Sequence, residues 1–126
     1  MNASKKILLV DDDPAIRSSL QFSLELQGFD VEAFASGETV IAEPELAAAG
    51  CLILDFRLPG MDGLSLLDRL RERGVVAPAV LITSNPTRQL RRRAEEAGAR
   101  LVEKPLLSGA LTKTIRSLTG EAAQGA

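Results

Sequence analysis

Four short apolar runs in this chain each end at a polar side chain that is capable of chemistry. The runs are residues 7–10, 52–54, 79–82 and 101–102. The polar residues that follow them are, in chain order, Asp11 with Asp12 and Asp13, Asp55, Thr83, and Lys104 behind Glu103. Short uninterrupted apolar runs are typical of strands buried on both faces of a parallel sheet. In such sheets the carboxyl ends of the strands border the crevice where ligands bind.

Strand patterns and helix patterns alternate five times, which predicts an α/β fold with a doubly wound, five-stranded parallel sheet. We expect strands at residues 6–10, 30–34, 52–54, 79–83 and 99–103, with the strand at 30–34 closer to an edge. Residues 47–50 are expected to form the loop into the third strand. The helices should span about residues 14–28, 37–42, 64–74, 87–97 and 108–118. Right-handed crossovers then place the carboxyl ends of all the strands on one edge of the sheet.

Short polar residues predict where two of these helices begin. Asp13-Pro14 and Asn85-Pro86 each place a capping side chain before a proline, which is tolerated at the first helical position. We therefore expect Asn85 to cap the helix at residues 87–97. That helix carries four arginines between residues 88 and 93, which we interpret as a solvated basic face rather than a docking surface for an acidic partner.

The composition narrows the classes of function. At 126 residues the chain is the size of one domain, expected at residues 1–120 with a short flexible tail at 121–126. The net charge of −2, with acids and bases interspersed, argues against direct binding of nucleic acid or a membrane, and we expect a cytoplasmic location. The chain has no histidine, which excludes a histidine base and an imidazole metal ligand. Any metal must be held by oxygen.

Asp55 taken alone would be interpreted as a turn residue, because a proline and two glycines lie close behind it. Its neighbours on the same sheet edge change this interpretation. Asp11, Asp12 and Asp55 would repel one another, so a cation should share their site. Mg²⁺, with Mn²⁺ as the alternative, binds through one or two carboxylates and leaves positions for phosphate oxygens. With Mg²⁺ and Lys104 neutralising charge, Asp55 would attack a phosphorus atom and Thr83 would donate a hydrogen bond to a phosphoryl oxygen.

Four motifs, in this order, resemble the response-regulator receiver domain of bacterial two-component signalling over residues 6–118. They are Leu-Val-Asp-Asp-Asp at 9–13, Leu-Asp-Phe-Arg-Leu-Pro-Gly-Met-Asp-Gly at 54–63, Ile-Thr-Ser at 82–84 and Glu-Lys-Pro at 103–105. The resemblance implies a flavodoxin-like sheet with the strand order 2-1-3-4-5. It further implies a phosphoacceptor of a phosphorelay and not an enzyme. Asp55 would receive a phosphoryl group from the phosphohistidine of a partner histidine kinase or histidine phosphotransfer protein, accept it also from small donors, and lose it slowly by self-hydrolysis.

The resemblance also implies roles for single residues. Those implied to bind Mg²⁺ are Asp11, Asp12, Asp55 and the backbone carbonyl of Arg57. Those implied to contact the phosphoryl group are Thr83 and Lys104. The implied switch pair is Thr83 with Leu101, and the positions implied to tune the phosphoryl lifetime are Arg57 and Asn85. A cis peptide between Lys104 and Pro105 is implied as well.

Two residues depart from the family pattern. The switch position, which is usually Tyr or Phe, is Leu101, and the aromatic residue that usually follows Lys-Pro is replaced by Leu106. Leucine has no ring to swing inward and no hydroxyl to bond. We therefore expect phosphorylation to proceed but to rearrange the output face less. Crystal structures with and without a phosphate mimic would contradict this if Leu101 exchanged rotamers and the face rearranged as usual.

The residues leave two other functions open. A phosphatase or mutase with an Asp nucleophile uses the same residue types, but it would carry a second Asp where this chain has Arg57. A degenerate receiver would act as a phosphorylation-independent binding module, and Leu101 and Leu106 leave that reading open. No DNA-binding or catalytic segment follows residue 118, so we expect an unknown downstream protein, unless the chain was cut from a longer protein. The last two helices are the expected surface for a homodimer.

Overall fold

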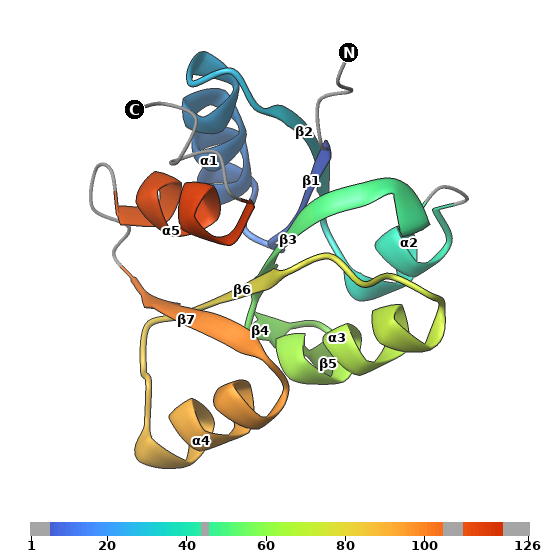
Figure 1. Cartoon of the computed structure of the whole chain (residues 1–126), viewed down its shortest axis with the longest axis vertical. Helices are drawn as coiled ribbons and strands as arrows, with labels where there is room; N and C mark the ends of the chain where they lie inside the picture. Colours follow the sequence, from blue (N-terminus) through green and yellow to red (C-terminus); the bar gives the residue numbers. More distant parts are fainter. Residues whose placement is uncertain (1–5, 44–45, 105–109, 120–126) are drawn as a thin grey trace.

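The computed structural model describes residues 6–43, 46–104 and 110–119, and it contains a five-stranded parallel sheet between two layers of helices (Figure 1). In spatial order the strands are β2 (Asp30–Phe34), β1 (Lys6–Val10), β3 (Ala49–Asp55), β6 (Ala79–Thr83) and β7 (Ala99–Glu103). Because β6 and β7 are the fourth and fifth strands of this sheet, the order is the 2-1-3-4-5 arrangement implied by the resemblance. The α/β fold prediction is confirmed.

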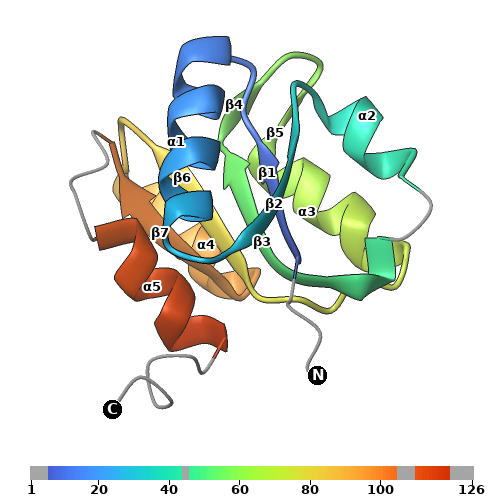
Figure 2. The same cartoon turned by 90° about the horizontal axis from the view of Figure 1, so that it is seen from above.

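Helices cover both faces of the sheet. α1 (Pro14–Leu26) and α5 (Ala110–Thr119) lie on one face, and α2 (Gly37–Ile41), α3 (Gly63–Glu72) and α4 (Arg88–Glu96) lie on the other (Figures 1 and 2). A short 3-10 helix, η1 (Leu46–Ala48), leads into β3. None of the described helices is long and apolar enough to cross a membrane.

The inner strands are buried on both faces, which explains their uninterrupted apolar runs. Leu52 and Leu81 belong to the core layer under α2, α3 and α4, whereas Ile53 and Val80 belong to the layer under α1 and α5. Successive residues of a strand point to opposite faces, so each inner strand has to be apolar at every position. Cys51 is buried in the second layer, and burial raises the pKa of its thiol to about 12. The cysteine is therefore an inert core residue.

Two segments differ from the sequence-based expectation. β3 begins at Ala49, which pairs with Lys6 across a local shift in register, so the predicted loop at residues 47–50 is wrong in its second half. Small residues carry little strand preference, and the pairing partner decided their conformation. A two-stranded antiparallel hairpin of β4 (Arg57–Leu58) and β5 (Met61–Asp62) was not predicted. Gly60, in the turn between them, has a positive φ of 83°.

One helix cap is confirmed and another is wrong. The Asp13 carboxylate accepts hydrogen bonds from the backbone N–H groups of Ala15 and Ile16 at 2.9 and 3.3 Å, as expected for the cap of α1. The cap of α4 is Thr87 rather than Asn85, because the Thr87 hydroxyl accepts the backbone N–H of Leu90 at 3.1 Å. The Asn85 side chain is therefore free of the structural role that the sequence suggested.

Several predictions lie outside the described residues. These are the peptide bond to Pro105, the residue Leu106, the beginning of the last helix before Ala110, and the tail at residues 121–126. The described part of the last helix agrees with the pattern, since Leu111 and Ile115 are buried.

Gly63 lets the hairpin of β4 and β5 fold back onto the end of β3. Its N–H donates to the carbonyl oxygen of Phe56 at 2.8 Å. A Cβ atom at this position would lie 2.6 Å from the backbone oxygen of Asp55 and 2.7 Å from a methyl carbon of Leu81. The first of these contacts is with backbone that cannot move aside without displacing Asp55.

We predict that Gly63→Ala lowers the free energy of unfolding by about 1–3 kcal/mol, because overpacking costs that much in a close-packed site. Without the clash the same change would stabilise the protein, since alanine is favoured over glycine in a helix by about 0.5–1 kcal/mol. Urea unfolding measures the difference. Ser65→Ala, an exposed change in the same helical turn, should shift stability by less than about 0.5 kcal/mol. A Gly63→Ala protein as stable as the wild type would contradict the prediction.

Candidate functional site

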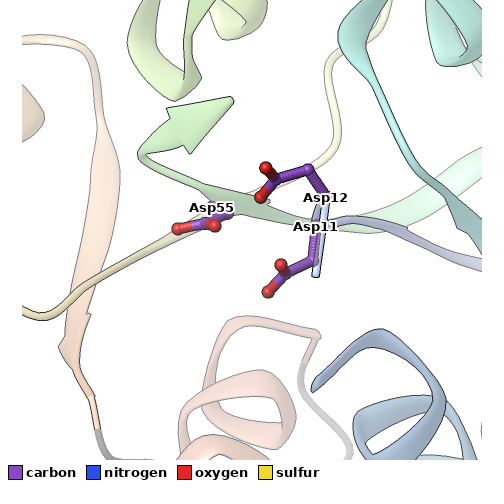
Figure 3. Close-up of side chains that lie close together, drawn as sticks. All are labelled: Asp11, Asp12 and Asp55. Atoms are coloured by element: carbon purple, nitrogen blue, oxygen red, sulfur yellow. The ribbon is translucent and has the colours of Figure 1, made fainter. Parts of the chain in front are cut away.

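Three carboxylates from two adjacent strand ends lie together at the carboxyl edge of the sheet. Asp11 and Asp12 follow β1 directly, Asp55 is the last residue of β3, and Figure 3 shows the three side chains close together at these strand ends. One oxygen of each carboxylate lies within 4.8 Å of the others. The register of the parallel pair, with Val10 opposite Leu54, brings the ends of the two strands level.

Asp11 is the most deeply placed of the three, with 1% of its surface exposed. Its backbone N–H donates to the carbonyl oxygen of Phe34 at 3.1 Å, and its Oδ1 accepts the N–H of Asp13 at 2.9 Å. Its Oδ2 is buried and has no hydrogen-bond partner among the described residues. Burial raises the pKa of the Asp11 carboxyl above its ordinary value, and the negative charges of Asp55 and Asp12 add to this rise.

Lys104 supplies a positive charge to the cluster from the end of β7, which lies two strands away from β3 in the sheet. It follows β7, and its Nζ lies 3.4 Å from Oδ1 of Asp55. The backbone N–H of Lys104 donates to the carbonyl oxygen of Thr83 at 2.8 Å, which ties the end of β7 to the end of β6. Because the Asp55 side chain is only 7% exposed, this ion pair is poorly screened by solvent.

Thr83 ends β6 between the acidic cluster and Lys104, and it is 4% exposed. Its hydroxyl oxygen accepts the backbone N–H of Asn85 at 3.2 Å. The hydroxyl acts as an acceptor in this bond, so its proton can be donated to a second group. The arrangement therefore offers one hydroxyl donor and one ammonium beside the Asp55 carboxylate.

These groups border a hollow of about 290 Å³. Its lining residues are Asp12, Asp13, Ile16, Asp55, Arg57, Thr83, Ser84 and Lys104. Ile16 and Ser84 are lining residues that the sequence pattern did not predict, and Asp13 was expected only to cap a helix. Ser84 directly follows Thr83, which was the available signal for it, whereas Ile16 matched a core pattern in α1.

The remaining predicted residues lie in different places. Arg57 is exposed at the beginning of β4 and lines the hollow, while Asn85 is exposed and does not line it. Leu101 is opposite Leu81 in the register of β7 with β6, and it is partly buried against the core layer of α2, α3 and α4. Residue 101 is thus held by packing on the face that α4 covers.

The donor set fits a divalent cation. Three carboxylates share this site with one ammonium in direct contact, and a divalent cation would lower the repulsion among them. The buried Oδ2 of Asp11 lacks a protein partner among the described residues, and such an oxygen is costly unless something bonds to it. Oxygen ligands with no described sulfur or imidazole in the cluster suit Mg²⁺ or Mn²⁺.

Comparison with known proteins finds one domain family that matches most of the chain. A sequence model described as "Response regulator receiver domain" matches residues 7–116. The C4-dicarboxylate transport transcriptional regulatory protein DctD of Rhizobium meliloti is 34% identical over 117 residues, which cover 92% of this chain and 25% of DctD. The transcriptional regulatory protein FixJ of Bradyrhizobium diazoefficiens is 32% identical over 123 residues, covering 97% of this chain and 60% of FixJ. The chain therefore spans between a quarter and three fifths of the length of these relatives.

Solved structures agree in fold. The chemotaxis protein CheY4 of Vibrio cholerae superposes with a TM-score of 0.85 at 26% identity, covering 92% of this chain and 99% of CheY4. The response regulator StyR has the same TM-score of 0.85 at 33% identity, covering 97% of this chain and 62% of StyR. Family match, relatives and fold point in one direction: the chain belongs to the response-regulator receiver domains of two-component signalling.

Proposed function

We propose that Asp55 is the phosphoacceptor of this receiver domain and that it takes its phosphoryl group from a phosphohistidine on a histidine kinase or a histidine phosphotransfer protein. The observation that carries the proposal is the Asp55 carboxylate, which lies at a strand end with Lys104 Nζ at 3.4 Å and with Asp11 and Asp12 beside it. A carboxylate nucleophile in such a site needs cationic groups around it to admit an anionic substrate. Lys104 is one such group.

The transfer exchanges one bond to phosphorus for another. A carboxylate oxygen of Asp55 forms the new P–O bond while the P–N bond of the donor breaks, and the electron pair of that bond stays on the imidazole nitrogen. The ammonium of Lys104 would neutralise charge on the phosphoryl oxygens, and the hydroxyl of Thr83 would donate to one of them. Both groups come from neighbouring strands, so the sheet holds them in place before the donor arrives.

Asp11, Asp12, Asp55 and the carbonyl oxygen of Arg57 would hold Mg²⁺ in the same hollow. The bound ion would neutralise the carboxylates and the phosphoryl oxygens, which lets like charges come together. The acidic cluster and the partnerless Oδ2 of Asp11 support this part of the proposal.

Other parts of the proposal concern regulation. Arg57 lines the hollow and would affect how water reaches the phosphorylated Asp55, while Asn85 would act from the loop after Thr83. Slow self-hydrolysis and acceptance from small donors are proposed on the same grounds. The comparisons offer no support for a degenerate, phosphorylation-independent module. The domain limits at residues 1–120, the cytoplasmic location and the downstream protein stay predictions.

We predict that incubation with acetyl phosphate adds one phosphoryl group to the wild type when Mg²⁺ is present and none after chelation. Asp55→Asn should abolish the adduct, because an amide nitrogen is not a nucleophile toward phosphorus. Intact-protein mass spectrometry measures the adduct.

Asp68→Asn is the matched control, since Asp68 is exposed on α3 and does not line the hollow. It should be phosphorylated like the wild type. A full adduct on Asp55→Asn would assign the acceptor to another residue, and an adduct that ignores chelation would remove Mg²⁺ from the proposal.

The partner that carries the phosphohistidine has to cover the hollow, and α1 flanks that opening. Ile16, in the first part of α1, lines the hollow, and Phe22 and Leu26 further along the helix are 65% and 72% exposed. Residues four apart lie on the same side of a helix, so these two side chains form one apolar surface. A large exposed apolar pair is typical of a protein contact, and this pair lies on the helix whose first turn borders the hollow. We propose that the phosphodonor protein contacts Phe22 and Leu26.

We predict that the double change Phe22→Ser with Leu26→Ser lowers kcat/KM for phosphotransfer from the partner protein about tenfold, as loss of apolar anchors does at interfaces. Phosphorylation by acetyl phosphate should be unchanged, because the small donor needs no docking surface. Val76→Ser is the control: Val76 is 85% exposed in the loop between α3 and β6, so it is an exposed apolar side chain that does not belong to α1. Equal losses with both donors, or the same loss with Val76→Ser, would contradict the contact.

A homodimer through α4 and α5 upon phosphorylation is also proposed. We predict that a phosphate mimic shifts the protein from monomer to dimer, and equilibrium sedimentation with and without the mimic measures the shift. An unchanged mass at the highest protein concentration would contradict this proposal.

A further inference from the structure

Arg17 makes a contact that neither the fold nor the proposed phosphotransfer explains. It is the fourth residue of α1, it is partly buried, and its guanidinium Nη1 donates to the backbone carbonyl oxygen of Asp11 at 2.8 Å. The contact joins the first turn of the helix to the strand end that it follows. Nothing in the sequence pattern predicted a role for Arg17.

The polar groups of Asp11 show what this contact completes. The backbone N–H is bonded to Phe34, the carbonyl oxygen to Arg17, and Oδ1 to the N–H of Asp13. The residue is held from three directions, by β2, by α1 and by the turn between β1 and α1. The polar atom of Asp11 that has no partner among the described residues is Oδ2, and it belongs to the acidic cluster.

We infer that Arg17 is a positioning residue: it fixes the backbone of Asp11 so that the carboxylate is preorganised as a ligand for a divalent cation. Asp11 lies past the end of β1, where the ladder no longer holds its carbonyl group. A buried carbonyl oxygen requires a donor, and the charged guanidinium supplies a strong one. Groups that orient a metal ligand in this way typically change metal affinity by 10–100-fold when they are removed.

The direction in which the affinity for Mg²⁺ changes when Arg17 is removed separates this role from simple electrostatics. Arg17 carries a positive charge close to a site for a cation, so as a point charge it weakens cation binding, and its removal would tighten binding. As a positioning residue it strengthens binding, and its removal would weaken it. A purely structural role predicts a third result, a lower unfolding temperature with unchanged affinity of the folded protein.

The test measures the Kd for Mg²⁺ by isothermal titration calorimetry, below the unfolding temperature of each variant. Arg17→Met keeps an unbranched apolar stem and removes the donor, and we expect its Kd to rise about tenfold. Arg17→Lys keeps the charge and one donor group, so its Kd should lie between those of Arg17→Met and the wild type. Arg92→Met removes the same charge from an exposed arginine on α4 that does not line the hollow, and it should leave Kd unchanged.

The inference rests on the proposed function, and the outcomes distinguish the two. A wild-type protein that binds Mg²⁺, together with an Arg17→Met variant that binds it equally or more tightly, would overturn the positioning role alone. A wild type that binds no Mg²⁺ would overturn both. If Arg17→Met does not fold, Arg17→Lys tests the inference. For this variant we also measure how far added Mg²⁺ raises the unfolding temperature, because that rise reports binding to the folded state. A rise as large as that of the wild type would overturn the inference.

Discussion

Parallel pairing on both sides of β3 is the constraint on which the rest of the molecule depends. β1 and β6 flank this strand, and its residues from Cys51 to Asp55 are buried. A strand in that position has to be apolar on both faces, so the first polar side chain that it tolerates is at its end. Asp55 stands there, level with Asp11 after β1 and beside Thr83 at the end of β6. The position of the carboxylate thus follows from the hydrogen-bond register of the sheet.

Charge balance is the second constraint. The cluster concentrates carboxylates around a residue that is 1% exposed, and burial with like-charge repulsion raises the pKa of Asp11. Lys104 compensates part of this cost, and the hollow leaves room for additional positive charge. The negative charge of such a site is poorly compensated when the site is empty and better compensated when it holds a cation together with a phosphoryl group. The chemistry that we propose is therefore also what makes the buried acids tolerable.

Much of the architecture could be predicted from the sequence, because the apolar runs and their polar ends carry physical information. β1, β2, β6 and β7 occupy the predicted residues, and Asp13 caps α1 as expected. The errors fall where local signals compete. Asn85-Pro86 has the appearance of a helix start, but the hydroxyl of Thr87 caps α4. The strand character of Ala49 comes from its pairing with Lys6 and not from its own preference.

The sequence by itself determined the order of the elements and the residue type at each strand end, since burial on two faces requires apolar runs and only strand ends admit charge. Only the tertiary structure decided the distances between those residues, such as 3.4 Å from Nζ of Lys104 to Oδ1 of Asp55. These residues belong to strand ends that are dozens of residues apart in the sequence. The tertiary structure also decided which residues outside the sequence motifs contact the site. Ile16 at the hollow and Arg17 on the carbonyl of Asp11 lie in an ordinary amphipathic pattern, and their contacts exist only once α1 packs back over the end of β1.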